Sequence, residues 1–187
     1  ASGLQVGPAA AAVGRAAVAV DAAAATGEEA ADAGADLLVT HHGLVWGGLD
    51  RVAGREYDAV AALVENDIAL YVSHLPLDGH PSLGNAAGLA DHLDLDDQTP
   101  FGTMGPVTIG RRGRAADAYS TDDLRERLDA LDTGGREPQV LEVGPDEIEE
   151  DAIVTGTRGD WLGEAGAGGA AARVTAEGKH RGYHQTR

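Results

Sequence analysis

The feature that most constrains the fold of this chain is a short apolar run that ends in two histidines. Leu37, Leu38 and Val39 follow a glycine and an aspartate, and the run stops at Thr40-His41-His42-Gly43. A short apolar run after glycine, with polar residues at its end, is typical of a buried parallel strand that leads into a loop. In open α/β sheets ligands bind at this end of the strands. The run therefore predicts an α/β fold with a site near residues 40–43.

The two histidines are unlike core residues. Successive strand side chains point to opposite faces of a sheet, so His41 and His42 cannot both face one core. At the end of a strand, the same geometry lets each imidazole bind a different metal ion. The alternative, from this stretch alone, is an exposed or hydrogen-bonded histidine pair that binds nothing.

Apolar runs and helical spacings alternate along the first half of the chain. We expect strands at 13–20, 36–40 and 68–72, helices within 22–33, 55–66 and 83–93, an edge segment at 2–8 and an acidic turn at 94–97. Residues 13–40 form one β–α–β unit, for which a right-handed crossover is expected.

The second half carries weaker signals. Residues 105–111 alternate like a strand, and a turn rich in Gly and Arg follows. Ser120 and the acidic residues after it predict a helix that runs to about Leu131. Strands are expected at 138–143 and 152–155, separated by an acidic turn at 144–151, and a helix is expected around Leu162.

Residues 169–177 align without a gap onto residues 34–42. If this is a repeat, the chain has two similar βα halves with mixed or parallel sheets flanked by helices, and a site at the strand ends. Glu177 would then lie opposite His42. Chance similarity between alanine-rich segments is the alternative. We expect a first half at 1–100 and a second half at 101–187.

The composition excludes several classes of protein. There are 31 Asp and Glu against 14 Lys and Arg, a formal charge of −17, and Lys179 is the single lysine. Disorder is one reading of such a chain, but the periodic apolar pattern favours a folded protein of a salt-loaded cytoplasm. At molar salt the Debye length falls to about 3 Å, so surface carboxylates hardly repel one another. Nucleic-acid binding is disfavoured, because no basic patch stands out.

The chain contains no cysteine, which excludes disulfides, thiolate catalysis and Cys-ligated metals. It shows no apolar stretch of about 18–20 residues and no signal segment, so we expect a cytoplasmic protein without a membrane partner.

Polar side chains follow several predicted strands. Nitrogen and oxygen ligands without sulfur suit zinc, manganese, iron or nickel better than copper(I). Adjacent histidines with a bridging carboxylate hold two ions about 3.5–4 Å apart. Pro76, between His74 and Asp78, argues for a loop there rather than a helix, and either residue alone is commonly a loop hydrogen-bonding group. The candidates are His41, His42, His74, Asp78, Glu177 and His184.

Other sites are less well supported. A Gly-x-Ser-x-Gly elbow and a phosphate-binding loop are absent, and residues 156–160 are a weak candidate for a phosphate cradle. Trp46 is either a lid or a stacking surface for a base, or a residue that packs at the rim of a small α/β domain. His80 is either a supporting residue or exposed, and His92 and His180 are expected at the surface.

These residues resemble a known family. Thr40-His41-His42-Gly43-Leu44-Val45-Trp46, then Ser73-His74-Leu75-Pro76-Leu77-Asp78 and Gly84-Asn85, are similar to the YbgI-like dinuclear-metal family, also called NIF-three-like, whose members are named type 2 GTP cyclohydrolase I homologues. The acidic, lysine-poor composition resembles a haloarchaeal member.

The resemblance implies an α/β fold of two similar halves and a toroidal homohexamer with two divalent ions per subunit. His41 and His42 would each bind one ion, Asp78 would ligate one of them and His74 would line the site. Thr175-Ala176-Glu177 and the segment at His184 resemble motifs of the second half. The family continues to a Gly-His-x-x-Thr-Glu motif that lies beyond Arg187, so we expect this chain to be a fragment or to lack two ligands.

Two functions follow from these expectations. The first is a metal-dependent hydrolase, similar to GTP cyclohydrolase, that acts on a nucleotide-like or phosphorylated small molecule, with Glu177 or His184 as proton carrier. The second is a non-enzymatic metal-binding or metal-delivery protein, or a ring-shaped interaction scaffold.

Overall fold

The structure, a computed structural model, describes the chain except residues 1, 133–136, 143, 155–164, 166–167 and 176–187. The chain divides into two compact units, Ala1–Leu77 and Asp78–Arg187. Each unit holds a four-stranded sheet flanked by helices, which confirms the predicted α/β class. The boundary in the sequence falls after Leu77, and the sequence-based division at residue 100 stays a prediction. In the described part of the chain, every helix is too short or too polar to cross a membrane.

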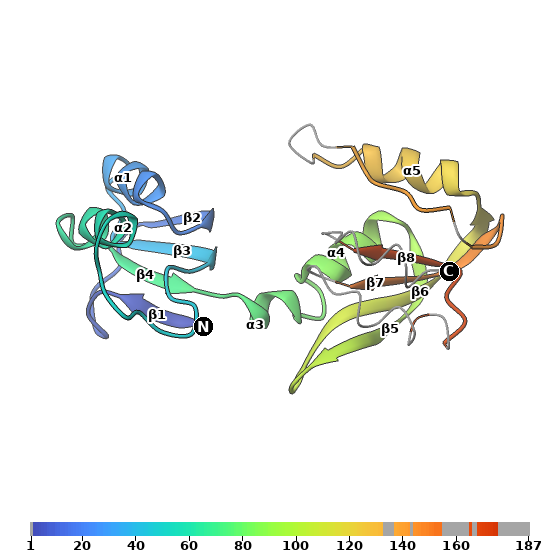
Figure 1. The fold of residues 1–187 in the computed structure, drawn as a ribbon, viewed down its shortest axis with the longest axis horizontal. Coiled ribbons are helices and arrows are strands. Elements are labelled where there is room, and N and C mark those ends of the chain that lie inside the picture. The colour runs from blue at the N-terminus through green and yellow to red at the C-terminus, as the bar shows by residue number, and fades with distance from the viewer. Residues whose placement is uncertain (1, 133–136, 143, 155–164, 166–167, 176–187) are drawn as a thin grey trace. The chain divides into compact units, whose positions relative to one another are not determined.

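The sheet of the first unit has the strand order β1-β4-β3-β2 (Figure 1). Strands β2, β3 and β4 are parallel, and β1 pairs antiparallel with β4 at one edge. The carboxyl ends of three strands therefore meet at one end of the sheet. The elements are β1 (Gly3–Val6), β2 (Ala16–Asp21), α1 (Ala24–Asp32), β3 (Leu37–His42), α2 (Arg55–Val64) and β4 (Ala69–Val72).

Both helices of the first unit pack on one face of this sheet. Leu38 of β3 and Leu70 of β4 lie in one buried cluster with Ala30 of α1 and Leu63 of α2. On the opposite face Val18 is 83% exposed and Tyr71 is also exposed. The alternation of side chains along a strand therefore separates a helix-covered face from an open one.

The sheet of the second unit has the order β5-β6-β7-β8, with antiparallel pairs up to β7 and a parallel β7–β8 pair. Helices α4 and α5 contribute to one buried cluster with Leu95, Tyr119 and Ile153 of the strands. The elements are α4 (Asn85–His92), β5 (Leu95–Met104), β6 (Val107–Tyr119), α5 (Thr121–Asp129), β7 (Ile148–Val154) and β8 (Ala172–Thr175), and α3 (Leu75–Asp78) spans the junction of the units.

The predicted repeat is present in the local structure. Gly34 and Gly169 both have positive φ, and each is followed by a strand in a parallel pair. The amide of Ala35 donates to the carbonyl of Ala30 over 2.9 Å, and that of Ala170 donates to the carbonyl of Ala165 over 3.1 Å. In the first unit this i to i−5 bond closes helix α1 at a glycine, and the second unit has a bond of the same span. In both units, the first paired residues of the two parallel strands lie 21 positions apart in the sequence, Ala16 with Leu37 and Asp151 with Ala172.

The Gly-Arg-rich segment is not the turn that the sequence predicts. Strand β6 runs through it, because its glycines allow close approach of neighbouring backbone. A Cβ at Gly110 would lie 2.5 Å from the carbonyl oxygen of Ile153, and one at Gly113 would lie 2.8 Å from the Cβ of Leu95. The prediction of an acidic turn at 94–97 is also partly wrong, because strand β5 begins at the buried Leu95.

Three further predictions are wrong. Residues 138–142 form no strand. The sheet of the second unit has the order β5-β6-β7-β8, so β5 occupies the position beside β6 and these residues pair with no strand. Strand β7 begins at Ile148 inside the predicted acidic turn, because Ile148 and Asp151 are buried. Pro76 lies in the short helix α3 rather than a loop, since a first-turn residue needs no amide hydrogen. The helix expected around Leu162 lies outside the described residues.

Candidate metal centre

The parallel strands bring three histidines together. His41 and His42 end β3, and His74 comes two residues after the end of β4. Thr40 pairs with Val72, and the amide of Ser73 donates to the carbonyl of Thr40 over 2.9 Å. This hydrogen bond carries the strand pairing past β4. The ring centroid of His41 therefore lies 4.7 Å from that of His42 and 4.8 Å from that of His74.

Hydrogen bonds indicate which nitrogen of His41 and of His42 can bind a metal. Nδ1 of His41 lies 3.3 Å from the carbonyl oxygen of Ser73, and Nδ1 of His42 lies 2.7 Å from a carboxylate oxygen of Asp21. Both oxygens are acceptors, so Nδ1 carries the proton in each ring. In a neutral imidazole protonated at Nδ1, the acceptor lone pair is on Nε2. An imidazole that binds a metal through one nitrogen usually donates the N–H of its other nitrogen to an oxygen in this way.

The three side chains fit a divalent cation. Each offers one nitrogen, and these nitrogens all lie within 4.8 Å of one another. All three residues are half-buried. Neutral imidazoles with Zn–N distances of about 2.0–2.1 Å are common in zinc sites. The cluster of His41, His42 and His74, which we call the histidine cluster, could therefore hold a metal ion.

The loop after the histidine pair is held by a residue that sequence analysis missed. Gln5 of β1 accepts hydrogen bonds from the amides of Leu44 and Val45, over 2.9 and 3.1 Å. Its amide group also lies against Gly43, where a Cβ would be 2.4 Å from Oε1 of Gln5. No local pattern around Gln5 indicates this role, because β1 reaches the loop only in the folded sheet.

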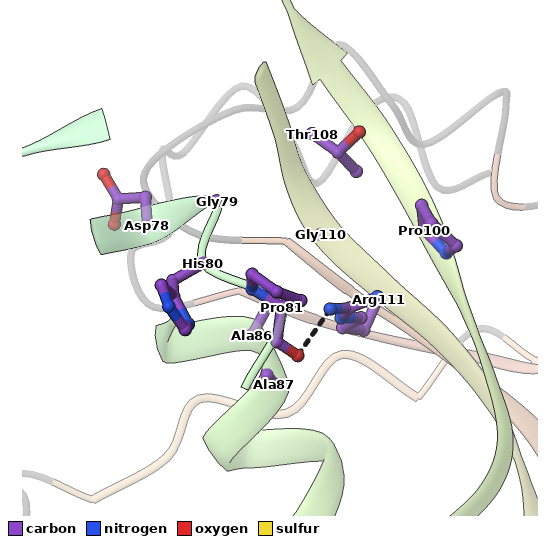
Figure 2. A pocket seen from close by; sticks show the side chains of 10 residues that line it. All are labelled: Asp78, Gly79, His80, Pro81, Ala86, Ala87, Pro100, Thr108, Gly110 and Arg111. Atoms are coloured by element: carbon purple, nitrogen blue, oxygen red, sulfur yellow. Dashed lines mark hydrogen bonds between the residues drawn. The ribbon is translucent and has the colours of Figure 1, made fainter. Parts of the chain in front are cut away.

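Asp78 belongs to the second unit. It is 8% exposed and accepts a hydrogen bond from Nδ2 of Asn85 over 3.2 Å. It also lines a pocket of about 190 Å³ with His80, Pro81 and Arg111 (Figure 2). In this pocket, Arg111 donates to the carbonyl of Pro81 over 2.5 Å. The ligand role expected for Asp78 stays a prediction.

The remaining candidates have other places. Nδ1 of His80 accepts hydrogen bonds from the amides of Ser82 and Leu83, over 3.2 and 3.0 Å, so this ring organises its own loop. His92 is half-buried rather than at the surface, with Nε2 at 2.8 Å from the carbonyl oxygen of Arg127. Glu177, His180, His184 and the segment 156–160 lie outside the described residues.

The family description Duf34/NIF3 (NGG1p interacting factor 3) matches residues 1–187. The chain belongs to this family. The family that the sequence motifs predict is thereby confirmed, and the two-sheet α/β architecture of the structure is the fold of its solved members.

Individual NIF3 relatives cover the whole of this chain. A protein of Halobacterium salinarum named "GTP cyclohydrolase 1 type 2 homolog" is 55% identical over 187 residues, which are 74% of its length. The solved structure of protein ybgI, described as of unknown function, matches with a TM-score of 0.86 and 31% identity, over the full chain and 73% of that protein. TTHA1606 from Thermus thermophilus matches with a TM-score of 0.82 and 33% identity, over the full chain and 72% of that protein.

Proposed function

We propose that this NIF3 protein is a metal-dependent hydrolase with a centre for two divalent ions at the histidine cluster. The observation that carries the proposal is the convergence of three imidazoles, in two of which Nδ1 faces an oxygen acceptor. Zinc, manganese, iron and nickel suit such ligands.

The residues of the chain would divide the work at this centre. His41, His42 and His74 hold the ions, and Asp78 supplies a carboxylate ligand. Asp21 and the carbonyl of Ser73 orient two of the rings. Glu177 or His184 carries a proton to or from the substrate. A bound divalent cation supplies Lewis acidity to such a site.

The substrate in this proposal is a nucleotide-like or phosphorylated small molecule. The name of the Halobacterium relative, "GTP cyclohydrolase 1 type 2 homolog", supports this class. We further propose a homo-oligomer, a hexameric ring, with no nucleic-acid or membrane partner. Light scattering of the purified protein tests the ring, and a monomer at micromolar concentration would contradict it.

A non-enzymatic metal-binding or metal-delivery protein is the second candidate. The partial exposure of the ligands favours it, since the side chain of His42 is 41% exposed and a cation there can exchange with solvent. Turnover distinguishes the two candidates. In the delivery protein metal would bind without any release of product.

Metal titration with His42→Ala tests the proposal. Zinc and manganese binding are measured by calorimetry on the metal-free protein, and hydrolysis is then measured with GTP and phosphoesters. We expect His42→Ala to weaken binding by more than the about 10- to 100-fold that loss of an outer partner costs. His92→Gln is the control, because His92 contacts the Arg127 carbonyl in the second unit. Equal affinities in wild type and His42→Ala would overturn the proposal.

A further inference from the structure

Trp46 is exposed but fixed in place beside the histidine cluster. The residue is 56% exposed, yet its Nε1 donates to the carbonyl of Gly43 over 2.9 Å. Its ring centroid lies 5.1 Å from that of His74, with the two planes at 87°, and 6.0 Å from that of His42. The indole is therefore held at the metal centre without being packed in a core.

The segment that carries the indole is itself pinned. Oε1 of Gln5 accepts from the amides of Leu44 and Val45, and the Gln5 side chain fills the space against Gly43. The carbonyl that binds the indole belongs to this same glycine. Strand β1 thus sets the position of Trp46, and little conformational freedom remains to be lost when a ligand binds.

Trp46 is exposed, although the polar N–H of its indole is hydrogen-bonded within its own loop. A surface tryptophan ordinarily keeps its N–H toward water and its ring against protein. Here the N–H donates to a carbonyl of the loop, while the residue as a whole is 56% exposed. The indole is thus an exposed aromatic surface, held in place beside the histidine cluster, on which a planar ring of a ligand can stack.

We propose that Trp46 is a stacking surface for a planar heterocyclic ring of the small molecule that reaches the histidine cluster. The proposal rests on the function proposed above and narrows its substrate class to molecules with such a ring. Stacking itself needs no metal, so it can be tested separately from the metal centre.

The test uses the full chain with Trp161→Phe, which leaves Trp46 as the single tryptophan of the sequence. Guanosine monophosphate and ribose 5-phosphate are titrated with and without zinc, by tryptophan fluorescence and by calorimetry. We expect guanosine monophosphate to quench Trp46 and ribose 5-phosphate to leave it unchanged. Trp46→Leu should weaken binding of the nucleotide by about 5- to 150-fold, the range for loss of one base–aromatic stack.

Two control variants separate stacking from folding and from metal binding. Trp46→Phe keeps an aromatic face and should retain most of the affinity, and Tyr57→Leu changes another exposed aromatic residue, on α2, and should have no effect. Zinc affinity should be the same in Trp46→Leu and wild type. Guanosine monophosphate binding that is absent, that is no tighter than that of ribose 5-phosphate, or that is unchanged in Trp46→Leu, would overturn the proposal. If the protein with Trp46 binds guanosine monophosphate as expected but does not bind zinc, the proposed metal centre alone is overturned.

Discussion

Asp21 is the residue that controls the orientation of His42. Its carboxylate accepts from Nδ1 of His42 over 2.7 Å, which limits rotation of the His42 ring. We expect Asp21→Ala to lower the affinity for zinc about 10- to 100-fold, the usual cost of losing such a partner. Calorimetric titration measures it. Asp32→Ala, an exposed carboxylate at the end of α1, is the control. Unchanged affinity in Asp21→Ala would show that the hydrogen bond does not orient the ligand.

A second ionisable pair lies in the core of the second unit. Asp151 is fully buried and accepts a hydrogen bond from the hydroxyl of Tyr119. Burial raises the pKa of Asp151, while the Tyr119 hydrogen bond and the charge of Arg127 oppose that rise. The guanidinium of Arg127 lies 4.7 Å from the centre of the Tyr119 ring. A carboxyl whose pKa is raised by folding favours the folded state in acid, and this contribution is lost as pH rises through the raised pKa.

Tyr119→Phe should therefore destabilise the protein more at neutral pH than in acid. The change removes the hydrogen bond that lowers the pKa of Asp151, so its pKa rises further and more stability is lost as pH increases. At pH 7 we expect a cost of about 1–3 kcal/mol, typical of a buried acceptor that loses its partner. Urea denaturation at pH 4 and pH 7 measures it, with Tyr57→Phe as the exposed control. A cost that is larger at pH 4 would contradict this account.

At the scale of elements, the contact between β1 and the loop after β3 positions the site. We expect Gly43→Ala to displace the amide group of Gln5, because the new Cβ would lie 2.4 Å from Oε1 and 2.5 Å from Nε2. Each hydrogen bond that is lost is worth about 0.5–1.5 kcal/mol. The fluorescence of Trp46 and the melting temperature should both change, since the Trp46 indole is bonded to the Gly43 carbonyl.

A double-mutant cycle tests whether Gln5 is the cause. Gln5→Ala removes the group that the new methyl would strike, so Gly43→Ala should cost little in that background. The two changes should then be non-additive by about 0.5–3 kcal/mol, the range for residues in contact. Gly88→Ala is the control glycine, because a Cβ there meets no atom within 4 Å. Additive effects would place the cause elsewhere.

Helix α5 shows how an element can be predicted from local sequence. Ser120 accepts from the amide of Asp123, and Asp123 accepts from the amide and hydroxyl of Ser120. These hydrogen bonds lower the pKa of Asp123. The capping sequence predicts the start of the helix correctly because every partner lies within four residues. The Gly-Arg segment of β6 lacks such a local determinant, and its glycines are explained only by strands far away in the chain.

At the scale of the whole molecule, the charge of −17 should make stability depend on salt. Self-repulsion of the carboxylates opposes the compact state when screening is weak, and the Debye length is about 10 Å at 0.1 M and 3 Å at 1 M ionic strength. We expect the melting temperature to fall on dilution from molar to 0.1 M sodium chloride. The double variant Asp94→Asn, Asp97→Asn should reduce this dependence. Both positions have positive φ, which asparagine tolerates. A melting temperature independent of salt would contradict the prediction.

The sequence by itself determined those features whose causes are local or periodic. The apolar runs that end at Thr40 and Val72 place two strands, and their polar ends place the histidines. The match of residues 169–175 to 34–40 gives the second parallel pair, because the same glycine turn and strand spacing recur in both units. These signals need no knowledge of distant residues.

Only the tertiary structure decided which residues support the site. Asp21 meets His42 because β2 and β3 pair in parallel with these residues in register. Gln5 of β1 accepts from the amide of Leu44, and Tyr119 donates to Asp151 on another strand. Each contact joins residues 21 to 39 positions apart, and its existence depends on strand order and register. Local propensity carries no information about either, because pairing energy arises only when the strands meet.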